Sequence, residues 1–318
     1  MGECGTAGYG AVSRIVITGA SGQYGRLATD KLIALGRAAD LILITRTPDK
    51  LADRAAQGCT VRYGDFDKPE TLAEAVAGAE TMLLISGTRV GARVVQHKAA
   101  IDAAAANGVR HIVYTSFVNV DEANPAIVTI DHRETEALIM ASGMAWTMLR
   151  DAHYADAMIL NAGPGFIASG IWQTSTAGGR EAMVWREDCV DCAVAVLTTP
   201  GHENKAYAIT GPNRETFGEV VAMMNAILGS AIRLVETDDD GMYAMFDAMG
   251  IPREPVDDQS VGGIPWNSDD MVSFERAIRE GHLDICTDDV ARLTGRKARS
   301  VRDLIEANAD MLKAYVQG

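Results

Sequence analysis

The chain has 318 residues, and its 29 Lys and Arg against 43 Asp and Glu give a formal net charge of −14 and a pI near 4.9. This balance argues against binding to nucleic acid or to anionic membranes, because both need clustered cations. Hydrophobic residues make up 47% of the sequence, a globular composition, and no apolar run approaches the roughly 20 residues of a membrane span.

Residues 1–13 are rich in Gly and small residues and lack the basic start and apolar centre of a signal peptide, so we expect a flexible tail. The five cysteines are few and odd in number, which favours a reducing cytoplasm over a disulfide framework. Cys189 and Cys192 form a single C-x-x-C inside an apolar helical pattern. Helix packing is favoured over redox chemistry there, and no metal site is expected.

Strand and helix patterns alternate through the first half of the chain. Apolar strands are expected at residues 14–18, 40–45, 60–63, 80–86, 109–115 and 145–149, with helices at 23–35, from 48, from 69, at 92–106 and at 131–141. Several of these strands are continuously apolar, which is typical of strands buried on both faces. The alternation predicts an α/β fold of Rossmann type, with a doubly wound parallel sheet.

The regular alternation ends after the sixth strand. We therefore predict an NAD(P)-binding Rossmann domain over residues 14–152, to which residues 185–212 return with a helix and a strand. Residues 153–184 and 213–318 are expected to form a smaller C-terminal substrate-binding lobe. Thr216 and Glu219 have the spacing of a capping box at the start of a helix. Residues 237–270 are acidic and loop-rich, and helices are expected at 271–280, 287–293 and 301–315.

A glycine-rich turn follows the first strand and opens the first helix. In such a turn the first glycine permits a sharp bend, the second lets the backbone approach a pyrophosphate, and the third lets the helix pack on the sheet. The helix N-terminus then offers N–H groups to the phosphates. The alternative is a tight turn that binds nothing. The predicted cofactor contacts here are Thr18, Gly19, Ser21, Gly22, Gln23, Tyr24 and Gly25.

The end of the second strand indicates which dinucleotide binds. An acid there favours NADH, but the sequence reads Thr45-Arg46-Thr47, and Arg46 suits a 2′-phosphate. We therefore favour NADPH over NADH, with Lys50 either a second phosphate contact or a solvated charge. Other strand ends supply further predicted contacts: Asp65 and Phe66 for adenine, and Ser86, Gly87, Thr115 and Ser116 for the pyrophosphate and nicotinamide.

The segments TGASGQYG, the Arg of TRTPDK, GDFD, LLISG, YTS and HRETEALI…GMAWTMLR together resemble the NmrA-like branch of the atypical short-chain dehydrogenase/reductases. The pattern is most similar to the bacterial NAD(P)H:quinone oxidoreductase and triphenylmethane reductase group. The resemblance spans about residues 14–212, with weaker similarity over TDDVARLTGRKARSVRDL. It implies a Rossmann fold with a small substrate lobe, NADPH as cofactor, and reduction of quinones, dyes or phenolics, although some members only sense the nucleotide.

The chain has no Tyr-x-x-x-Lys pair, which excludes the alcohol dehydrogenase mechanism of the wider family. Hydride delivery to a quinone needs mainly proximity and a closed pocket. Similarity to isoflavone and pinoresinol–lariciresinol reductases places His132 where those enzymes have a catalytic Lys. His132 is thus a candidate proton donor, with a structural role as the alternative.

Asp151 and His153 stand where the quinone reductase group tends to have Asn and Trp. As neighbours they are expected either to shuttle a proton or to fix the loop as an ion pair. Aromatic residues nearby are candidates for a substrate wall, with core packing as the alternative. These residues are Phe117, Tyr154, Phe166 and Trp172.

The sequence thus predicts an NADPH-dependent reductase of a small aromatic or quinone-like electrophile. Reduction of a benzylic ether or an enone is an alternative, as are a non-catalytic NADP(H)-binding redox sensor and an isomerase or lyase with bound cofactor. A small-molecule substrate and a homodimer are expected, without nucleic acid or membrane partners.

Overall fold

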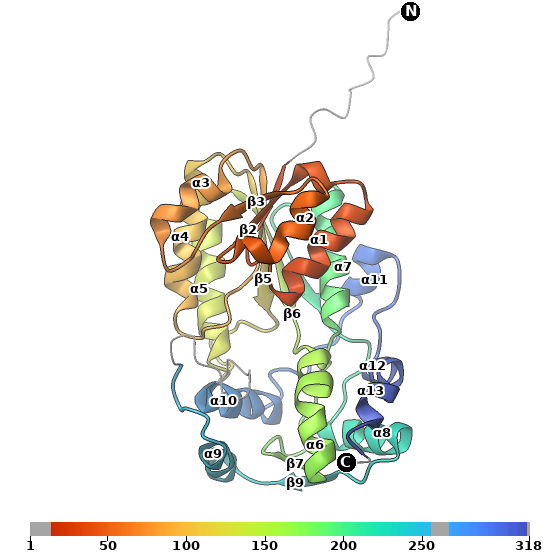
Figure 1. Ribbon diagram of the computed structural model, residues 1–318. Helices are drawn as coiled ribbons and strands as arrows, with labels where there is room; N and C mark the ends of the chain where they lie inside the picture. Colours follow the sequence, from red (N-terminus) through yellow and green to blue (C-terminus); the bar gives the residue numbers. More distant parts are fainter. Residues whose placement is uncertain (1–13, 256–266, 317–318) are drawn as a thin grey trace, which may run out of the picture.

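The computed structural model describes residues 14–255 and 267–316 (Figure 1). The expected tail at residues 1–13, and residues 256–266 of the acidic stretch, lie outside the described part of the chain. A seven-stranded sheet forms the centre of the molecule, in the order β3-β2-β1-β4-β5-β6-β8, and all its strand pairs are parallel. This confirms the predicted doubly wound Rossmann-type sheet.

The sheet strands follow the expected segments with small shifts at their ends. They are β1 (Ile15–Ile17), β2 (Leu41–Thr45), β3 (Thr60–Tyr63), β4 (Thr81–Leu84), β5 (His111–Phe117), β6 (Ala145–Asp151) and β8 (Lys205–Ile209). β1 and β2 are buried along their whole length, as continuous apolar runs predict. β5 and β6 each run two residues further than expected, because their paired register continues to Phe117 and Asp151.

Helices cover both faces of the sheet. Ile15 and Ile17 of β1 belong to the core cluster that contains residues of α1 (Gln23–Ala34) and α7 (Arg186–Thr198), and these two helices contact each other. Val16 belongs to the cluster with α3 (Leu72–Val76) and α4 (Arg93–Ala106), and α4 packs against α5 (Val128–Ala141). Successive residues of one strand therefore bury opposite layers.

The remaining short helices connect strands on the nucleotide-binding half. Pro48 and Pro69 each open a 3₁₀ turn that continues as a short α-helix. The elements are η1 (Ala38–Asp40), η2 (Pro48–Leu51), α2 (Ala52–Ala56) and η3 (Pro69–Thr71). Proline suits a first helical turn because its missing N–H would have no partner there.

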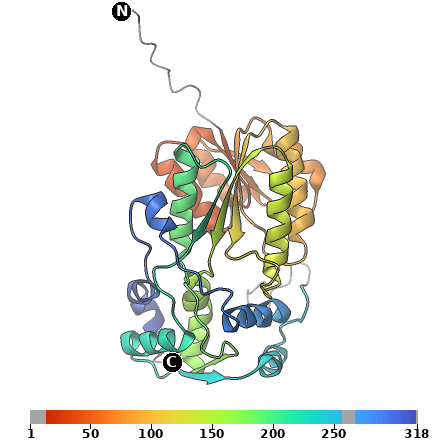
Figure 2. The ribbon, with the colours of Figure 1, turned by 180° about the vertical axis from the view of Figure 1, so that it is seen from behind.

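The C-terminal lobe lies beyond the carboxyl ends of the strands (Figures 1 and 2). Its helices are a π-helical turn η4 (Ala157–Ala162), α6 (Gly163–Ser169), α8 (Phe217–Leu228), α9 (Asp239–Ala248), α10 (Ser268–Arg279), α12 (Val301–Ala307) and α13 (Ala309–Lys313), and it has a parallel strand pair, β7 (Ile171–Thr174) with β9 (Arg233–Glu236). α11 (Asp289–Thr294) instead packs against α7 and β8 of the nucleotide-binding half (Figure 1). Thr216 and Glu219 form the expected capping box at α8. In both views α10 lies below the lobe-side end of α5.

Three lobe segments differ from the sequence expectation. The small-residue segment 153–184 folds into η4, α6 and β7. α9 lies in the stretch expected to be loop, where Asp238 caps it and Met242 and Phe246 cluster with Val272 of α10. The expected helix at 301–315 is interrupted at Asn308. Tertiary burial, rather than local pattern, selects these elements. None of the described helices is long and apolar enough to cross a membrane.

Candidate cofactor and active site

The glycine turn after β1 has the geometry that its sequence predicts. Gly19 has φ +58°, which L side chains rarely adopt. The N–H of Ala20 donates to the carbonyl of Ile44 over 3.0 Å, which ties the turn to β2. A Cβ on Gly25 would lie 2.6 Å from the Cα of Ala20, so only glycine allows this approach of α1 to the turn.

The N-terminus of α1 is free to receive a phosphate. Its N-cap is the exposed Gly22, no side chain caps the helix, and its first turn contains no acidic residue. The first N–H groups and the helix dipole therefore favour an anion at this point. Gln23 is exposed beside it. The backbone groups of residues 19–25 could thus hold a dinucleotide pyrophosphate.

Tyr24 lies on the other side of α1 from this surface. Its side chain is buried, and its hydroxyl donates to the carbonyl of Cys189 over 3.0 Å. Burial raises the pKa of Tyr24 well above its usual value, so the phenol is neutral. Tyr24 and the buried Cys189 and Cys192 thus serve the packing of α1 on α7, and the C-x-x-C thiols are free.

The expected 2′-phosphate contacts lie on the surface after β2. Arg46 and Lys50 are both exposed, and no acid occupies the strand end. Arg26 was not predicted, but it connects this loop to the glycine turn. Its Nε donates to the carbonyl of Ser21 over 3.1 Å and its Nη2 to the carbonyl of Lys50 over 2.6 Å. The hydroxyls of Ser21 and Thr45 are 2.8 Å apart.

Asp65 and Phe66 lie in the turn after β3. The Asp65 carboxylate accepts the N–H of Asp67 over 3.1 Å, and its own N–H donates to Thr71 Oγ1 over 3.0 Å. Phe66 meets the ring of His97 edge-on at 6.1 Å. Both residues are half-buried. The Asp65 carboxylate therefore already has a local role in this turn.

Two α4 side chains that were not predicted hold the loop after β4. The N–H of Gly87 donates to Nε2 of His97 over 3.0 Å, and Arg93 Nε donates to the carbonyl of Gly87 over 2.5 Å. The N–H of Ser86 donates to Thr115 Oγ1 over 2.9 Å. Thr18 Oγ1 similarly accepts the N–H of Ile85 over 3.0 Å. The Thr18 and Thr115 hydroxyls therefore position backbone that faces the predicted cofactor site.

Ser116 belongs to a buried charge network. Its hydroxyl donates to Glu136 over 2.6 Å, and Arg150 donates to both oxygens of the same carboxylate over 2.9 and 2.6 Å. This network joins β5, β6 and α5 next to the carboxyl end of β5. The Ser116 hydroxyl therefore already has a hydrogen-bond partner within the fold.

His132 is buried in the interior between β5 and α5. Its Nδ1 lies 2.7 Å from the hydroxyl of Tyr114, and its ring stacks on Phe117 with centroids 6.1 Å apart. Burial, aided by the charges of Arg93 and His97, lowers the pKa of His132 well below its usual value. The imidazole is therefore neutral at pH 7. These contacts favour the structural alternative over a cationic proton donor.

The expected pairing of Asp151 with His153 is wrong, because each has another partner. Asp151 accepts from the Tyr154 hydroxyl over 2.7 Å, whereas His153 Nδ1 lies 3.2 Å from Glu181 Oε1. β6 ends at Asp151, and the N–H of Val184 then donates to the carbonyl of His153 over 2.9 Å. That pairing carries His153 toward the 181–184 segment. Burial raises the pKa of Asp151 to about 7.

The aromatic wall also differs from the expectation. Trp172 is 1% exposed and packs between Phe166 and Phe217 in the lobe core, with ring centroids at 4.3 and 4.8 Å. The Tyr154 ring is covered by the Arg186 guanidinium at 4.9 Å. Core packing, the alternative, therefore holds for Trp172. The rings of Phe166 and Phe217 fill the space around the Trp172 indole and stabilise it by aromatic packing.

A different set of rings meets beyond the ends of β5 and β6. Phe274 of α10, which sequence reasoning missed, lies edge-on to Phe117 at 5.5 Å and 4.6 Å from the ring of His153. Phe274 and His153 are half-buried. No local signal distinguished Phe274 from a core aromatic of an amphipathic helix. It reaches these rings because α10 lies beyond the carboxyl ends of β5 and β6 (Figure 1).

A doubly wound parallel sheet with an uncapped glycine-rich helix N-terminus after β1 defines a dinucleotide-binding protein of the Rossmann type. The pattern of the NAD(P)H-binding family matches residues 19–200, and the chain belongs to this family. Within the described residues, no group of three or more His, Cys, Asp or Glu side chains is placed to hold a metal ion.

Among curated proteins, the chain is 33% identical to quinone oxidoreductase 2 of Escherichia coli (strain K12) over 238 residues, which cover 75% of this chain and 82% of that protein. It is 30% identical to the (4-alkanoyl-5-oxo-2,5-dihydrofuran-3-yl)methyl phosphate reductase of Streptomyces griseus, over 93% of this chain and 98% of that one.

Solved structures agree with these relatives. The E. coli NADPH-dependent quinone oxidoreductase in complex with NADPH superposes with a TM-score of 0.83 at 28% identity, covering 92% of this chain and 99% of that one. The Citrobacter sp. triphenylmethane reductase gives 0.81 at 29% identity, covering 94% and 100%. The comparisons confirm the expected family and the class of NAD(P)H-dependent oxidoreductase.

Proposed function

We propose that the protein is an NADPH-dependent reductase that transfers a hydride to a small planar aromatic or quinone-like electrophile. The observation that carries this proposal is the uncapped, acid-free N-terminus of α1 beside the exposed Arg46, with rings gathered beyond the same sheet edge. Bound NADPH supplies two electrons and a hydrogen as hydride. Its 2′-phosphate suits Arg46, because a guanidinium binds phosphate by charge-assisted bonds.

The chain's own groups position the reactants. Arg93 and His97 fix the loop after β4, and the Ser116–Glu136–Arg150 network fixes the end of β5. The half-buried rings of Phe274 and His153, packed beside the buried Phe117, offer a flat surface for a planar acceptor. The names of the E. coli and Citrobacter relatives support an acceptor of this kind, and that of the S. griseus relative supports a conjugated lactone or enone as a second candidate.

The test is NADPH consumption by the purified protein with quinones, triarylmethane dyes, enones and benzylic ethers, beside an enzyme-free control. Saturable consumption with at least one quinone or aromatic acceptor is expected. Tight NADPH binding without consumption of any acceptor would contradict the proposal and favour a redox sensor.

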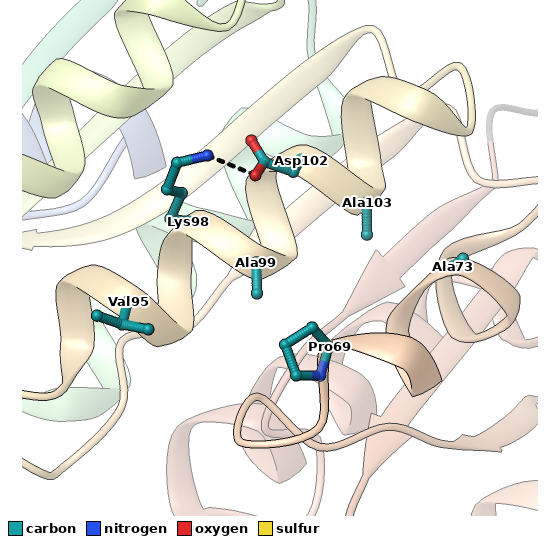
Figure 3. Close-up of a pocket in the computed structure, with 7 residues that line it drawn as sticks. All are labelled: Pro69, Ala73, Val95, Lys98, Ala99, Asp102 and Ala103. Atoms are coloured by element: carbon teal, nitrogen blue, oxygen red, sulfur yellow. Dashed lines mark hydrogen bonds and ion pairs between the residues drawn. The ribbon is translucent and has the colours of Figure 1, made fainter.

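We also infer a homodimer, for which the α4 surface is a candidate face. Figure 3 shows a surface hollow there, and Val95 at its rim is 75% exposed. The residues around the hollow are Pro69, Ala73, Val95, Lys98, Ala99, Asp102 and Ala103. Light scattering of the purified protein would return twice the 33.9 kDa chain mass if this inference holds.

The free thiols of Cys59, Cys189, Cys192 and Cys286 support a cytoplasmic location.

A further inference from the structure

We propose that His153 is the acid that protonates the reduced acceptor through Nε2, and that Glu181 is the positioning residue at Nδ1. The assignment rests on the proposed reductase function. Nδ1 lies 3.2 Å from Glu181 Oε1, and no described residue hydrogen-bonds to Nε2. A carboxylate at one ring nitrogen fixes the tautomer and the orientation of an imidazole, and leaves the other nitrogen for chemistry.

Glu181 is placed firmly enough to orient a ring. Its backbone exchanges two hydrogen bonds with Glu215, over 3.2 and 2.9 Å. Its side chain is only 2% exposed, and Oε2 has no hydrogen-bond partner among the described residues. A buried carboxylate is costly without a counter-charge. A protonated His153 would supply that charge at the ring nitrogen that Glu181 contacts.

His153 also lies where an acceptor is expected. It follows the end of β6 by two residues, at the carboxyl edge of the sheet where ligands of such folds bind. Its ring is 4.6 Å from Phe274, which in turn meets Phe117. The side chain retains 19% exposure. An acceptor on these rings would have Nε2 within reach, whereas Glu181 is shielded behind the imidazole.

The other charged groups around His153 do not replace Glu181. Asp270, in the first turn of α10, interacts with the His153 charge, and burial raises the pKa of Asp270 to about 6. Asp151 lies two residues away in the chain, and its carboxylate is engaged by Tyr154. Tyr154 itself is neutral, because burial raises the pKa of its phenol well above the usual value. Glu181 is thus the described carboxylate in hydrogen-bonding contact with the ring.

The proton step balances as follows for a quinone. Hydride addition carries two electrons to the conjugated acceptor and leaves an oxyanion. The Nε2–H bond of the imidazolium breaks, its proton forms an O–H bond on that oxygen, and the neutral imidazole is reprotonated from water. The net change is quinone, NADPH and H⁺ to hydroquinone and NADP⁺. A cationic triarylmethane dye differs, because hydride addition to its central carbon cancels the charge and needs no proton.

This difference between acceptors gives the test. We would measure kcat for 1,4-naphthoquinone and for malachite green with wild type, His153→Gln and Glu181→Gln. His202→Gln is the matched control, because it removes an imidazole that bonds Tyr207 of β8. General acid catalysis contributes roughly 10²–10⁴-fold. We expect His153→Gln to lower the quinone-to-dye ratio of kcat by at least about tenfold, with a smaller fall in Glu181→Gln and none in the control.

A second readout does not depend on turnover. Nitrogen NMR of the His153 imidazole in the cofactor-free protein reports on the Nδ1 contact directly, and the Nδ1 resonance should move in Glu181→Gln because the carboxylate is lost. Circular dichroism shows whether each variant folds. If His153→Gln does not fold, Glu181→Gln still tests the assignment. Equal fractional losses with both acceptors, or an unmoved Nδ1 resonance in Glu181→Gln, would overturn the assignment. If wild type reduces neither acceptor, the assignment fails, and the wider acceptor panel decides separately whether the proposed function fails as well.

Discussion

The backbone N–H of Gly87 donates to Nε2 of His97 over 3.0 Å, so a side chain of α4 fixes the loop that ends β4. Because Nε2 accepts, Nδ1 carries the proton and donates to Thr135 Oγ1 over 3.0 Å. Burial lowers the pKa of His97 to about 3. The ring therefore stays neutral at physiological pH, and the Gly87–His97 hydrogen bond persists over that pH range.

His97→Ala should loosen this loop. A buried N–H without a partner costs roughly 1–3 kcal/mol, which the loop avoids by moving. We expect NADPH affinity to fall by roughly tenfold, and the melting temperature to fall as well. Fluorescence titration with NADPH measures the affinity, and hydrogen exchange at Gly87 measures the loosening. His97→Gln, which keeps a side-chain acceptor, should lose less. Wild-type affinity and exchange in the alanine variant would contradict a clamping role.

Arg46→Ala should change cofactor choice. The exposed guanidinium at the end of β2 is the group that we assign to the 2′-phosphate, and a charge-assisted hydrogen bond contributes roughly 1.5–3 kcal/mol. NADPH affinity should fall about 10–100-fold, while NADH affinity changes little. Lys50→Ala serves as a comparison with a smaller expected loss. Equal losses of affinity for NADPH and NADH would show that Arg46 does not contact the 2′-phosphate.

Gly22→Val should block the cofactor without unfolding the protein. Gly22 is exposed at the N-cap of α1, and its Cβ would lie 3.2 Å from the carbonyl of Gly19. The branched side chain would cover the N–H groups that receive the pyrophosphate. Calorimetric titration should detect no NADPH binding, with a smaller fall in melting temperature than in Gly25→Ala. Gly25→Ala is the contrasting variant. Its Cβ would meet the turn backbone at 2.6 Å, so it should lower stability.

The fold was predictable because long-range burial leaves a local trace. A strand covered on both faces is apolar along nearly its whole length, as β2 is. The turn after β1 needs a glycine at position 19, because the backbone there has a positive φ. Thr216 and Glu219 likewise carry a complete local signal, since both partners of the capping box lie within one helical turn.

The contacts inside the site left no such trace. Glu181 reaches His153 across 28 residues, and nothing in the sequence around either residue specifies that pairing. Phe274 joins the rings because the lobe places α10 beyond the ends of β5 and β6 (Figure 1), while Trp172, an equally plausible aromatic, is enclosed in the lobe core. The sequence therefore predicts where the backbone meets a ligand better than which side chains face it.

The last prediction concerns Asp151 and the pH dependence of stability. Burial raises the pKa of Asp151 from 3.8 to about 7, with the Tyr154 and Cys189 hydrogen bonds opposing that rise. The folded state therefore binds more protons than the unfolded state between these two values. The contribution of Asp151 to the free energy of unfolding is fully present below about pH 4 and is lost as pH rises through 7. Its size is roughly 1.4 kcal/mol for each unit that separates the folded and unfolded pKa values.

Asp151→Asn removes this titration and keeps an oxygen that accepts from Tyr154. Urea denaturation at pH 5 and pH 8 should show wild type losing more free energy of unfolding than the variant between these pH values. Burial also raises the pKa of Glu275 to about 7 and that of Asp270 to about 6, but both residues are present in each protein, so their contributions cancel in the comparison. The same pH dependence in wild type and variant would mean that Asp151 is ionised throughout, compensated by a group other than Tyr154.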